Sequence, residues 1–449
     1  MTKLLSELHS LVWGVPALVL ILGVGLWLTA GLGLVQLRLF PRAMRRFLAQ
    51  LRPARGGEGV TGFQALCTAL AATVGTGNLV GVAGALCLGG PGAIFWMWLC
   101  GILGMATKFA EATLALRYRV RTPEGFAGGP MYTIARGLGR KWLPLAKAYC
   151  VFGIIAAFGV GNATQVSAVA SGVGGVLSAF GAAPGRGFYL ALGVVLAAFL
   201  GNLLRGGAGA IGSAAEKLVP FAAAGYILLC LYALWAGRAA LPAALAAIFR
   251  GAFDPRAVTG GMLGSAVEAL RIGCSRGVFT NEAGMGTASI AHAAASVDRP
   301  AQQGLLGMVE VFLDTIVICT LTALVILVSG VPIPYGRDVG GQLTTAAFAR
   351  FYGAGAPVLL TAFLVCFAVA TVLGWGLYGS ACARFLLGSA WAGAFVWVQM
   401  GVVVVSCVAD TASVWQLSET VNGLMAIPNL ISLALLLPEL RRLTKEIGE

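Results

Sequence analysis

Polar residues stand beside glycines inside long apolar stretches of this chain. The clearest case is "GTGN" at 75–78, within the apolar segment 61–88. If a helix breaks there, its freed N–H groups can bind a carboxylate and its freed carbonyls can coordinate a hard cation. Broken backbone at membrane depth is tolerated only where it is buried in protein or lines a wet cavity. The segment therefore predicts a binding site for a small zwitterion and a cation. The alternative is helix packing, which Gly77 and Gly81 would serve as a small-xxx-small pair.

A second glycine-punctuated stretch, "TGGMLGSAVEALRIGCSRG", covers residues 259–277 and carries Glu268 and Arg271. An ionisable residue inside a membrane span is costly, and is functional by default. Glu268 is therefore a candidate functional residue. The alternative is a structural pair with Arg271, three residues further along the helix.

Two further pairs of side chains share a helical face. Asn162 and Gln165 are one turn apart, and either bind a ligand or join neighbouring helices. Thr371 and Trp375 are four residues apart, so a cation-binding hydroxyl would lie one turn from an indole that could close a small pocket. The alternative for Trp375 is packing between helices.

Two other groups of polar residues have a structural interpretation. Lys108 and Glu111 are three residues apart and predict an ion pair within one helix. The segment "RGVFTNEAGMG" at 276–286 is interpreted either as a capped turn, tied down by Asn281 and Glu282, or as part of a gate.

Composition determines the class of protein that must position these residues. The chain is 59% hydrophobic and 10% charged, with a mean hydropathy of +0.89, whereas soluble domains carry about 25% charged residues. This predicts a polytopic, all-α membrane protein. The net charge of +13 comes from residues placed between apolar segments, which is typical of topology determinants and not of nucleic-acid binding. The scattered cysteines, and the distance between His9 and His292, indicate neither disulfides nor a metal cluster.

Apolar runs of about 20 residues predict eleven spans. The first is interpreted as a retained span and not as a cleaved signal peptide. The excess of arginine after the odd-numbered spans, as in 38–55, predicts a cytoplasmic C-terminus and an external N-terminus. The predicted spans are 11–36, 61–88, 91–117, 143–180, 187–204, 210–236, 257–276, 303–329, 355–385, 387–408 and 413–437.

Two glycine-broken spans, five spans apart, are the sequence sign of an inverted-repeat transporter. The segments 75–119 and 276–295 resemble signatures of the alanine or glycine:cation symporter family, as do "GNATQVSAVA" (161–170) and "TVLGWGLYG" (371–379). The resemblance extends over nearly the whole chain. It implies the leucine-transporter fold, with an extra helix (11–36) ahead of repeats at 61–236 and 257–437.

The resemblance also implies uptake of alanine or glycine, coupled to Na⁺ or H⁺, in a bacterial or archaeal cytoplasmic membrane. The implied substrate contacts are Gly75, Thr76, Gly77, Asn78, Gln165, Glu268, Thr371 and Trp375. The implied Na⁺ ligands are Ala71, Val74, Phe367, Ala370 and Thr371. The usual cation site of the fold often has two adjacent hydroxyl residues. Ala370 supplies none, which leaves the choice between Na⁺ and H⁺ open.

Two other functional classes are weighed against transport. A membrane enzyme would need a nucleophile with its base, or a metal site, and His292 has no evident partner in the sequence. A channel would not depend on a coupled gradient. We expect no catalytic residue and no cofactor other than the coupling ion. The expected partners are the amino acid and membrane lipid, and the oligomeric state stays open.

Overall fold

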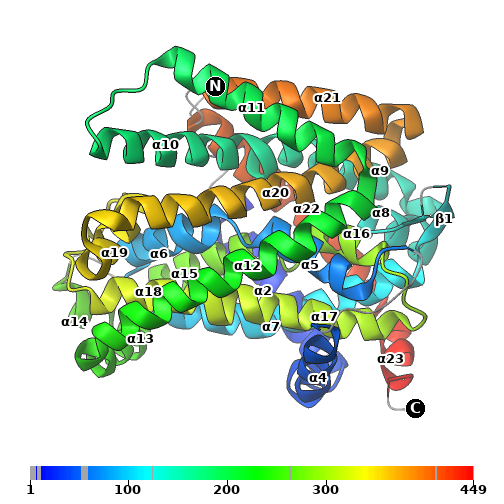
Figure 1. The fold of residues 1–449 in the computed structure, drawn as a ribbon. Coiled ribbons are helices and arrows are strands. Elements are labelled where there is room, and N and C mark those ends of the chain that lie inside the picture. The colour runs from blue at the N-terminus through cyan, green and yellow to red at the C-terminus, as the bar shows by residue number, and fades with distance from the viewer. Residues whose placement is uncertain are drawn as a thin grey trace.

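The protein is a bundle of long helices with a small β-hairpin at one end (Figure 1). The structure is a computed structural model that describes Glu7 and residues 12–51, 59–123, 125–261, 265–409 and 412–447. His9, residues 52–58 of one predicted basic connection and residues 262–264 of one predicted span lie outside this part of the chain.

The first half of the bundle ends with α12, and η marks a short 3-10 or π-helical segment. Its elements are α2 (Val15–Gly31), α3 (Val35–Arg38), α4 (Phe40–Gln50), α5 (Gly62–Thr73), η1 (Gly77–Gly81), α6 (Val82–Gly89), α7 (Gly92–Arg117), β1 (Val120–Thr122), β2 (Gly125–Ala127), α8 (Pro130–Tyr132), η2 (Thr133–Leu138), η3 (Arg140–Trp142), α9 (Leu143–Phe158), η4 (Gly159–Ala163), α10 (Thr164–Ala179), α11 (Arg186–Arg205) and α12 (Gly207–Ala236).

The second half runs from η5 to the C-terminal helix. Its elements are η5 (Arg238–Ala240), α13 (Leu241–Phe253), α14 (Pro255–Thr259), α15 (Ala266–Asn281), α16 (Thr287–Ala293), α17 (Pro300–Val311), η6 (Phe312–Cys319), α18 (Thr320–Val328), α19 (Gly341–Tyr352), η7 (Gly353–Gly355), α20 (Ala356–Leu387), α21 (Ser389–Ser406), α22 (Ala412–Leu435) and α23 (Leu437–Lys445).

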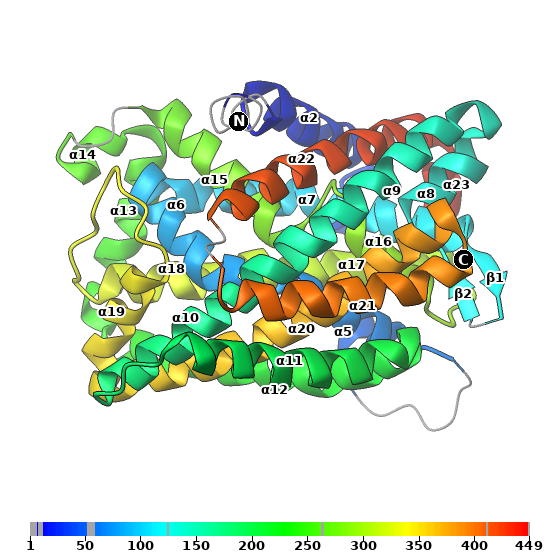
Figure 2. The same ribbon diagram turned by 90° about the horizontal axis from the view of Figure 1, so that it is seen from above.

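Within the described residues, seven helices are long and apolar enough to cross a membrane, or up to nine if each bent pair is one span. The prediction of an α-helical, multi-pass membrane protein is confirmed, while the number eleven stays a prediction. The short helices α13, α14 and α19 lie at one end of the bundle, and the hairpin, α8 and α23 lie at the other (Figures 1 and 2). The predicted spans did not include α13 or α19, since neither reaches the length of a span, and the predicted span 257–276 overlaps the end of α14.

Helix α20 runs through the middle of the bundle and packs against α5, α9, α10 and α12. Its approach to α5 is close because a glycine faces it: a methyl group on Gly374 would lie 2.8 Å from the Cβ atom of Ala72. This contact brings the middle of α20 against the end of α5, where the predicted site lies.

The start of α5 is fixed by a reciprocal cap and by a neighbouring segment. The Thr61 hydroxyl accepts the Gln64 N–H at 3.1 Å, while the Gln64 side chain accepts the Thr61 N–H at 3.0 Å. The preceding Val60 pairs with Ala295 in a parallel bridge, and the Ser296 N–H donates to the Val60 carbonyl at 2.7 Å. The end of α16 is thereby joined to the beginning of α5.

The second interruption does not lie where the sequence suggested. Residues 266–281 form one unbroken helix, α15, so the prediction of a break within 259–277 is wrong for this part. Gly273 serves packing, because a methyl group on it would lie 2.3 Å from the Ala93 carbonyl oxygen of α7. Helical geometry stops only at Glu282, and α16 begins after Gly286.

Candidate functional site

The first break separates α5 from η1 and bends the span by 51°. Val74 is extended, with ψ of 99°, and ends α5. The Gly75 N–H donates to the side-chain oxygen of Asn78 at 2.9 Å, and the Thr76 N–H points to the side-chain oxygen of Gln165 at 3.5 Å. In a continuous helix these two N–H groups would bind the carbonyls of Ala71 and Ala72. The break therefore frees carbonyl oxygens at the end of α5.

Three predicted site residues converge on this break. A methyl group on Gly75 would lie 2.9 Å from the Thr371 hydroxyl and 3.3 Å from the Gln165 side-chain oxygen. The hydroxyl of Thr76 is buried and has no hydrogen-bond partner among the described residues. Buried polar groups are normally paired. A polar ligand bound at the break would supply the partner that the Thr76 hydroxyl lacks.

The groups predicted to bind a cation lie at the end of α5 and in the middle of α20, and these two helices pack against each other. The Thr371 hydroxyl donates to the Phe367 carbonyl at 2.9 Å, and it retains lone pairs that can bind a cation. Ala71, Val74, Phe367 and Ala370 are all buried. A freed Ala71 carbonyl and the Thr371 hydroxyl are oxygen donors of the kind that a hard cation requires. This donor set fits Na⁺.

Trp375 is fully buried one turn further along α20. Its indole N–H donates to the Glu282 carboxylate at 3.1 Å. A methyl group on Gly161 would lie 2.2 Å from the ring, so η4 presses directly against the indole. Trp375 is thus held from two sides.

Asn78 and Gly77 are engaged with protein groups at the same break. The Asn78 side-chain nitrogen donates to the Asp314 carboxylate at 2.7 Å, while the oxygen of the same amide caps Gly75. Gly77 faces Thr280 of α15, whose methyl carbon would lie 3.2 Å from an added methyl group. These contacts hold the shape of the break.

Glu268 lies apart from the other predicted residues. It is in the first turn of α15, thirteen residues before Asn281, which is about 20 Å along the helix. Its carboxylate forms a two-pronged pair with Arg271 at 2.6 and 3.1 Å, and its side chain is 42% exposed. The structure therefore gives Glu268 the pairing that was the alternative, and does not bring it to Gly75.

The second break, at residues 282–286, lies in the segment that the sequence analysis interpreted either as a capped turn or as part of a gate. Glu282, Gly284 and Gly286 have positive φ values of 54°, 98° and 77°. The Glu111 carboxylate of α7 accepts the N–H groups of Gly284 at 2.8 Å and Gly286 at 3.1 Å, and the Asn429 side-chain amide at 2.8 Å. The two glycines of "EAGMG" are the sequence signal that could have indicated this break.

The predicted ion pair between Lys108 and Glu111 is wrong. The Lys108 ammonium instead lies 3.2 Å from the Glu310 carboxylate of α17, and both side chains are fully buried. His292 of α16 contacts the other oxygen of Glu310 at 2.9 Å. Spacing along one helix indicates local partners only, and here the partner comes from another helix.

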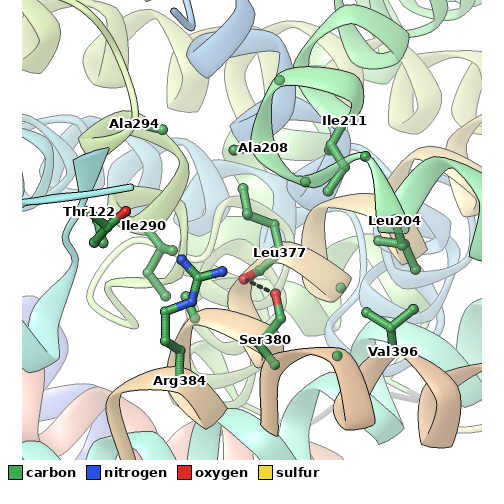
Figure 3. A pocket seen from close by; sticks show the side chains of 18 of the residues that line it. Thr122, Leu204, Ala208, Ile211, Ile290, Ala294, Leu377, Ser380, Arg384 and Val396 are labelled. Atoms are coloured by element: carbon green, nitrogen blue, oxygen red, sulfur yellow. Dashed lines mark hydrogen bonds between the residues drawn. The ribbon is translucent and has the colours of Figure 1, made fainter. Parts of the chain in front are cut away.

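A cavity of about 430 Å³ opens beside the C-terminal half of α20 (Figure 3). It reaches from the β1–β2 hairpin, at Thr122, to Gly376 and Leu377, which directly follow Trp375. Ile290 of α16 lines one side and Leu204 of α11 the other, and Arg384 projects between them (Figure 3). The cavity therefore lies at the hairpin end of the bundle, and the residues that line it do not include Gly75, Gln165 or Thr371.

Comparison with known proteins gives the family. The profile of the sodium:alanine symporter family matches residues 1–448. The chain is 43% identical to the sodium/alanine symporter AgcS of Methanococcus maripaludis, over 97% of this chain and 94% of that one. It is 37% identical to the probable sodium/glutamine symporter GlnT of Bacillus subtilis, over 95% of this chain and 87% of that one.

The crystal structure of MhsT in complex with L-phenylalanine has a similar fold. The TM-score is 0.56 at 14% identity, and the match covers 86% of this chain and 99% of MhsT. The predicted leucine-transporter fold is confirmed by this likeness. With a family profile matched along nearly its entire length, the chain belongs to the sodium:alanine symporter family, and is a membrane transporter and not an enzyme.

Proposed function

We propose that this protein carries alanine and other small neutral amino acids across the membrane together with Na⁺. The single observation that carries the proposal is the first break, where Gly75, Gln165 and Thr371 meet at a buried interruption of α5. The N–H groups at the start of η1 suit the substrate carboxylate, and the unpaired Thr76 hydroxyl adds a donor.

The Na⁺ ligands in this proposal are the carbonyls of Ala71, Val74, Phe367 and Ala370 with the Thr371 hydroxyl. Support comes from the freed end of α5, from the close approach of α20, and from the names of the two relatives, both of which specify sodium. Because Ala370 offers no hydroxyl, the site has one side-chain oxygen, and a proton remains the competing coupling ion.

Alanine, and not glutamine, is the substrate that the pocket favours. One relative is named for each amino acid. Trp375 fills the space one turn from Thr371 and is fully buried against Gly161. A bulky indole at this distance leaves room for a methyl group but not for a long side chain. Glycine, which has no side chain, fits the same pocket.

The orientation of the chain in the membrane is inferred from the arginine-rich connections between the predicted spans. We propose that the C-terminus is cytoplasmic and the N-terminus external, in a bacterial or archaeal cytoplasmic membrane. The cavity at the hairpin end would then open inward, as one stage of alternating access between repeats at 61–236 and 257–437. A cysteine introduced at Arg45 should resist a membrane-impermeant reagent in intact cells; rapid labelling would reverse the topology.

Proteoliposome uptake tests the proposed function. Radiolabelled alanine should accumulate when a Na⁺ gradient is imposed and not when a proton gradient alone is imposed. Thr371→Ala should raise the Na⁺ concentration for half-maximal uptake about tenfold, the loss expected for one oxygen ligand. Thr361→Ala is the matched control, because Thr361 is also on α20 but donates to the Gly172 carbonyl. Accumulation driven only by protons would contradict Na⁺ coupling.

A further inference from the structure

Glu282 occupies an unusual backbone position in the second break. Among the described residues, only Leu34 and Glu282 have a positive φ without being glycine. A residue with a Cβ atom adopts this conformation at a cost in free energy. The neighbouring Gly284 and Gly286 avoid that cost, so the side chain at 282 must be there for another reason.

The Glu282 carboxylate joins two elements that are remote in sequence. One oxygen accepts the indole N–H of Trp375 on α20 at 3.1 Å, and the other accepts the hydroxyl of Thr287 at the start of α16 at 2.5 Å. Glu282 is only 3% exposed. Hydrogen bonds to a buried carboxylate are strong, because the acceptor is charged and water does not compete.

The indole of Trp375 is fixed by three contacts. Gly161 lies against its ring, and Tyr378 meets it in a T-shaped contact, with ring centroids 5.7 Å apart. These two contacts are apolar and constrain the ring plane. The bond to Glu282 is directional and determines which edge of the indole faces the second break.

We propose that Glu282 is a positioning residue for substrate selectivity, which orients the Trp375 indole as a wall of the substrate pocket. This inference rests on the proposed function, because it concerns the same pocket. No described hydrogen bond joins the side chain of Glu282 to Gly75, Gln165 or Thr371 at the first break. Glu282 therefore acts through the indole. When the second break changes shape, Glu282 moves with it and thereby changes the orientation of the Trp375 indole.

The competing explanation is that Glu282 only ties the start of α16 to the break, by accepting the Thr287 hydroxyl. The two roles predict different patterns among variants. Glu282→Asp keeps the charge and suits the left-handed conformation, but its carboxylate is one methylene shorter and cannot reach the indole. Trp375→Phe keeps the bulk and removes the N–H. Thr287→Val removes only the hydroxyl that donates to Glu282.

Equilibrium binding of alanine and valine to purified variants is the test. Glu282→Asp and Trp375→Phe should each lower the ratio of alanine to valine affinity by about five- to tenfold, within the range that one or two methylene groups discriminate. The double variant should lower the ratio no further than Trp375→Phe alone. Thr287→Val should leave it within about twofold. A chain carrying Thr320→Val is the matched control, since the Thr320 hydroxyl accepts the N–H of another indole, Trp98, at 2.7 Å.

A second measurement does not depend on the substrate. The ultraviolet resonance Raman difference between wild type and Trp375→Phe isolates one indole, whose N–H band reports hydrogen bonding. Glu282→Asp should shift this band to the position of a weaker bond. An unshifted band, or an unchanged affinity ratio in folded Glu282→Asp, would overturn the proposal. If the wild type does not bind alanine, the proposed substrate is wrong, and the Raman band alone decides whether Glu282 orients Trp375.

Discussion

The breaks after α5 and after α15 interrupt two helices in similar ways, but different chemical groups hold them open. At the first, neutral amide side chains take the freed N–H groups: Asn78 accepts from Gly75, and Gln165 accepts from Thr76. At the second, one carboxylate, Glu111, accepts from both Gly284 and Gly286.

This difference suggests that the first break can bind a ligand, whereas the second break has a structural role. A neutral hydrogen bond contributes about 0.5–1.5 kcal/mol and a charged one about 1.5–3 kcal/mol. A ligand can therefore compete for the N–H groups of the first break at modest cost. A ligand would compete much less well for the N–H groups of the second break, because the buried carboxylate of Glu111 already accepts them.

The largest effect should come from removing the acceptor of the second break. Glu111→Ala leaves two main-chain N–H groups buried without a partner, and should lower the free energy of unfolding by about 3–5 kcal/mol and abolish uptake. Thermal unfolding in detergent measures the first effect. Glu439→Ala is the control, because Glu439 pairs at the surface with Arg442 and should cost less than about 1 kcal/mol. If Glu111→Ala were as stable as wild type, the charged support would be unnecessary.

Crowding the first break should weaken substrate binding while the protein stays folded. Gly75→Ala places a methyl group 2.9 Å from the Thr371 hydroxyl, and overpacking of about 1–3 kcal/mol would weaken alanine binding by roughly 5- to 150-fold. Gly81→Ala, in the same interrupted span, is the matched control, since a methyl group there meets no atom within 4 Å. Equal losses in the two variants would contradict a site at Gly75.

Replacing one neutral acceptor should have a smaller effect. Gln165→Leu removes the partner of the Thr76 N–H, and should weaken alanine binding about tenfold, equivalent to about 1.4 kcal/mol. Expression and thermal stability should change little. Gln399→Leu is a suitable comparison, because Gln399 is also a buried amide but donates to the Val372 carbonyl and, among the described residues, accepts no N–H of the break. Normal alanine binding by Gln165→Leu would make Gln165 a structural link between helices.

The smallest effect on transport should come from the glycines of α15. Gly273→Ala should destabilise the protein by about 1–3 kcal/mol through overpacking against Ala93, whereas Gly277→Ala should be nearly neutral because its methyl group would lie 3.4 Å from Cys100. Neither variant should alter the Na⁺ dependence of uptake. A changed Na⁺ dependence in Gly273→Ala would mean that α15 takes part in ion binding.

Glycine positions show why the sequence predicted the first break and misplaced the second. Gly75 and Gly273 look alike in the sequence, since each lies in an apolar span beside polar residues. The structure separates them: Gly75 stands at a turn beside hydroxyl and amide groups, and Gly273 allows two helices to touch. A glycine indicates that a side chain is not tolerated, but not whether backbone conformation or a neighbouring helix is the cause.

Partners from distant segments explain the remaining differences. Glu111 and Lys108 share one helical face, which suggested a mutual pair. Their actual partners lie in the second break and on α17. In contrast, the membrane class follows from composition, and most of the long helices follow from the apolar runs, because each depends on properties of a contiguous segment.

The bridge between Val60 and Ala295 has a consequence for the kinetics of the transporter. The Gln303 side chain also donates to the Gly62 carbonyl at 3.1 Å, so α5 is tied to the chain after α16 at more than one point. Helices α5 and α16 cannot move apart without breaking these bonds. We therefore expect the start of α5 and the end of α16 to move together, so that amide exchange at Ser296 and a distance probe on α5 report the same time constant.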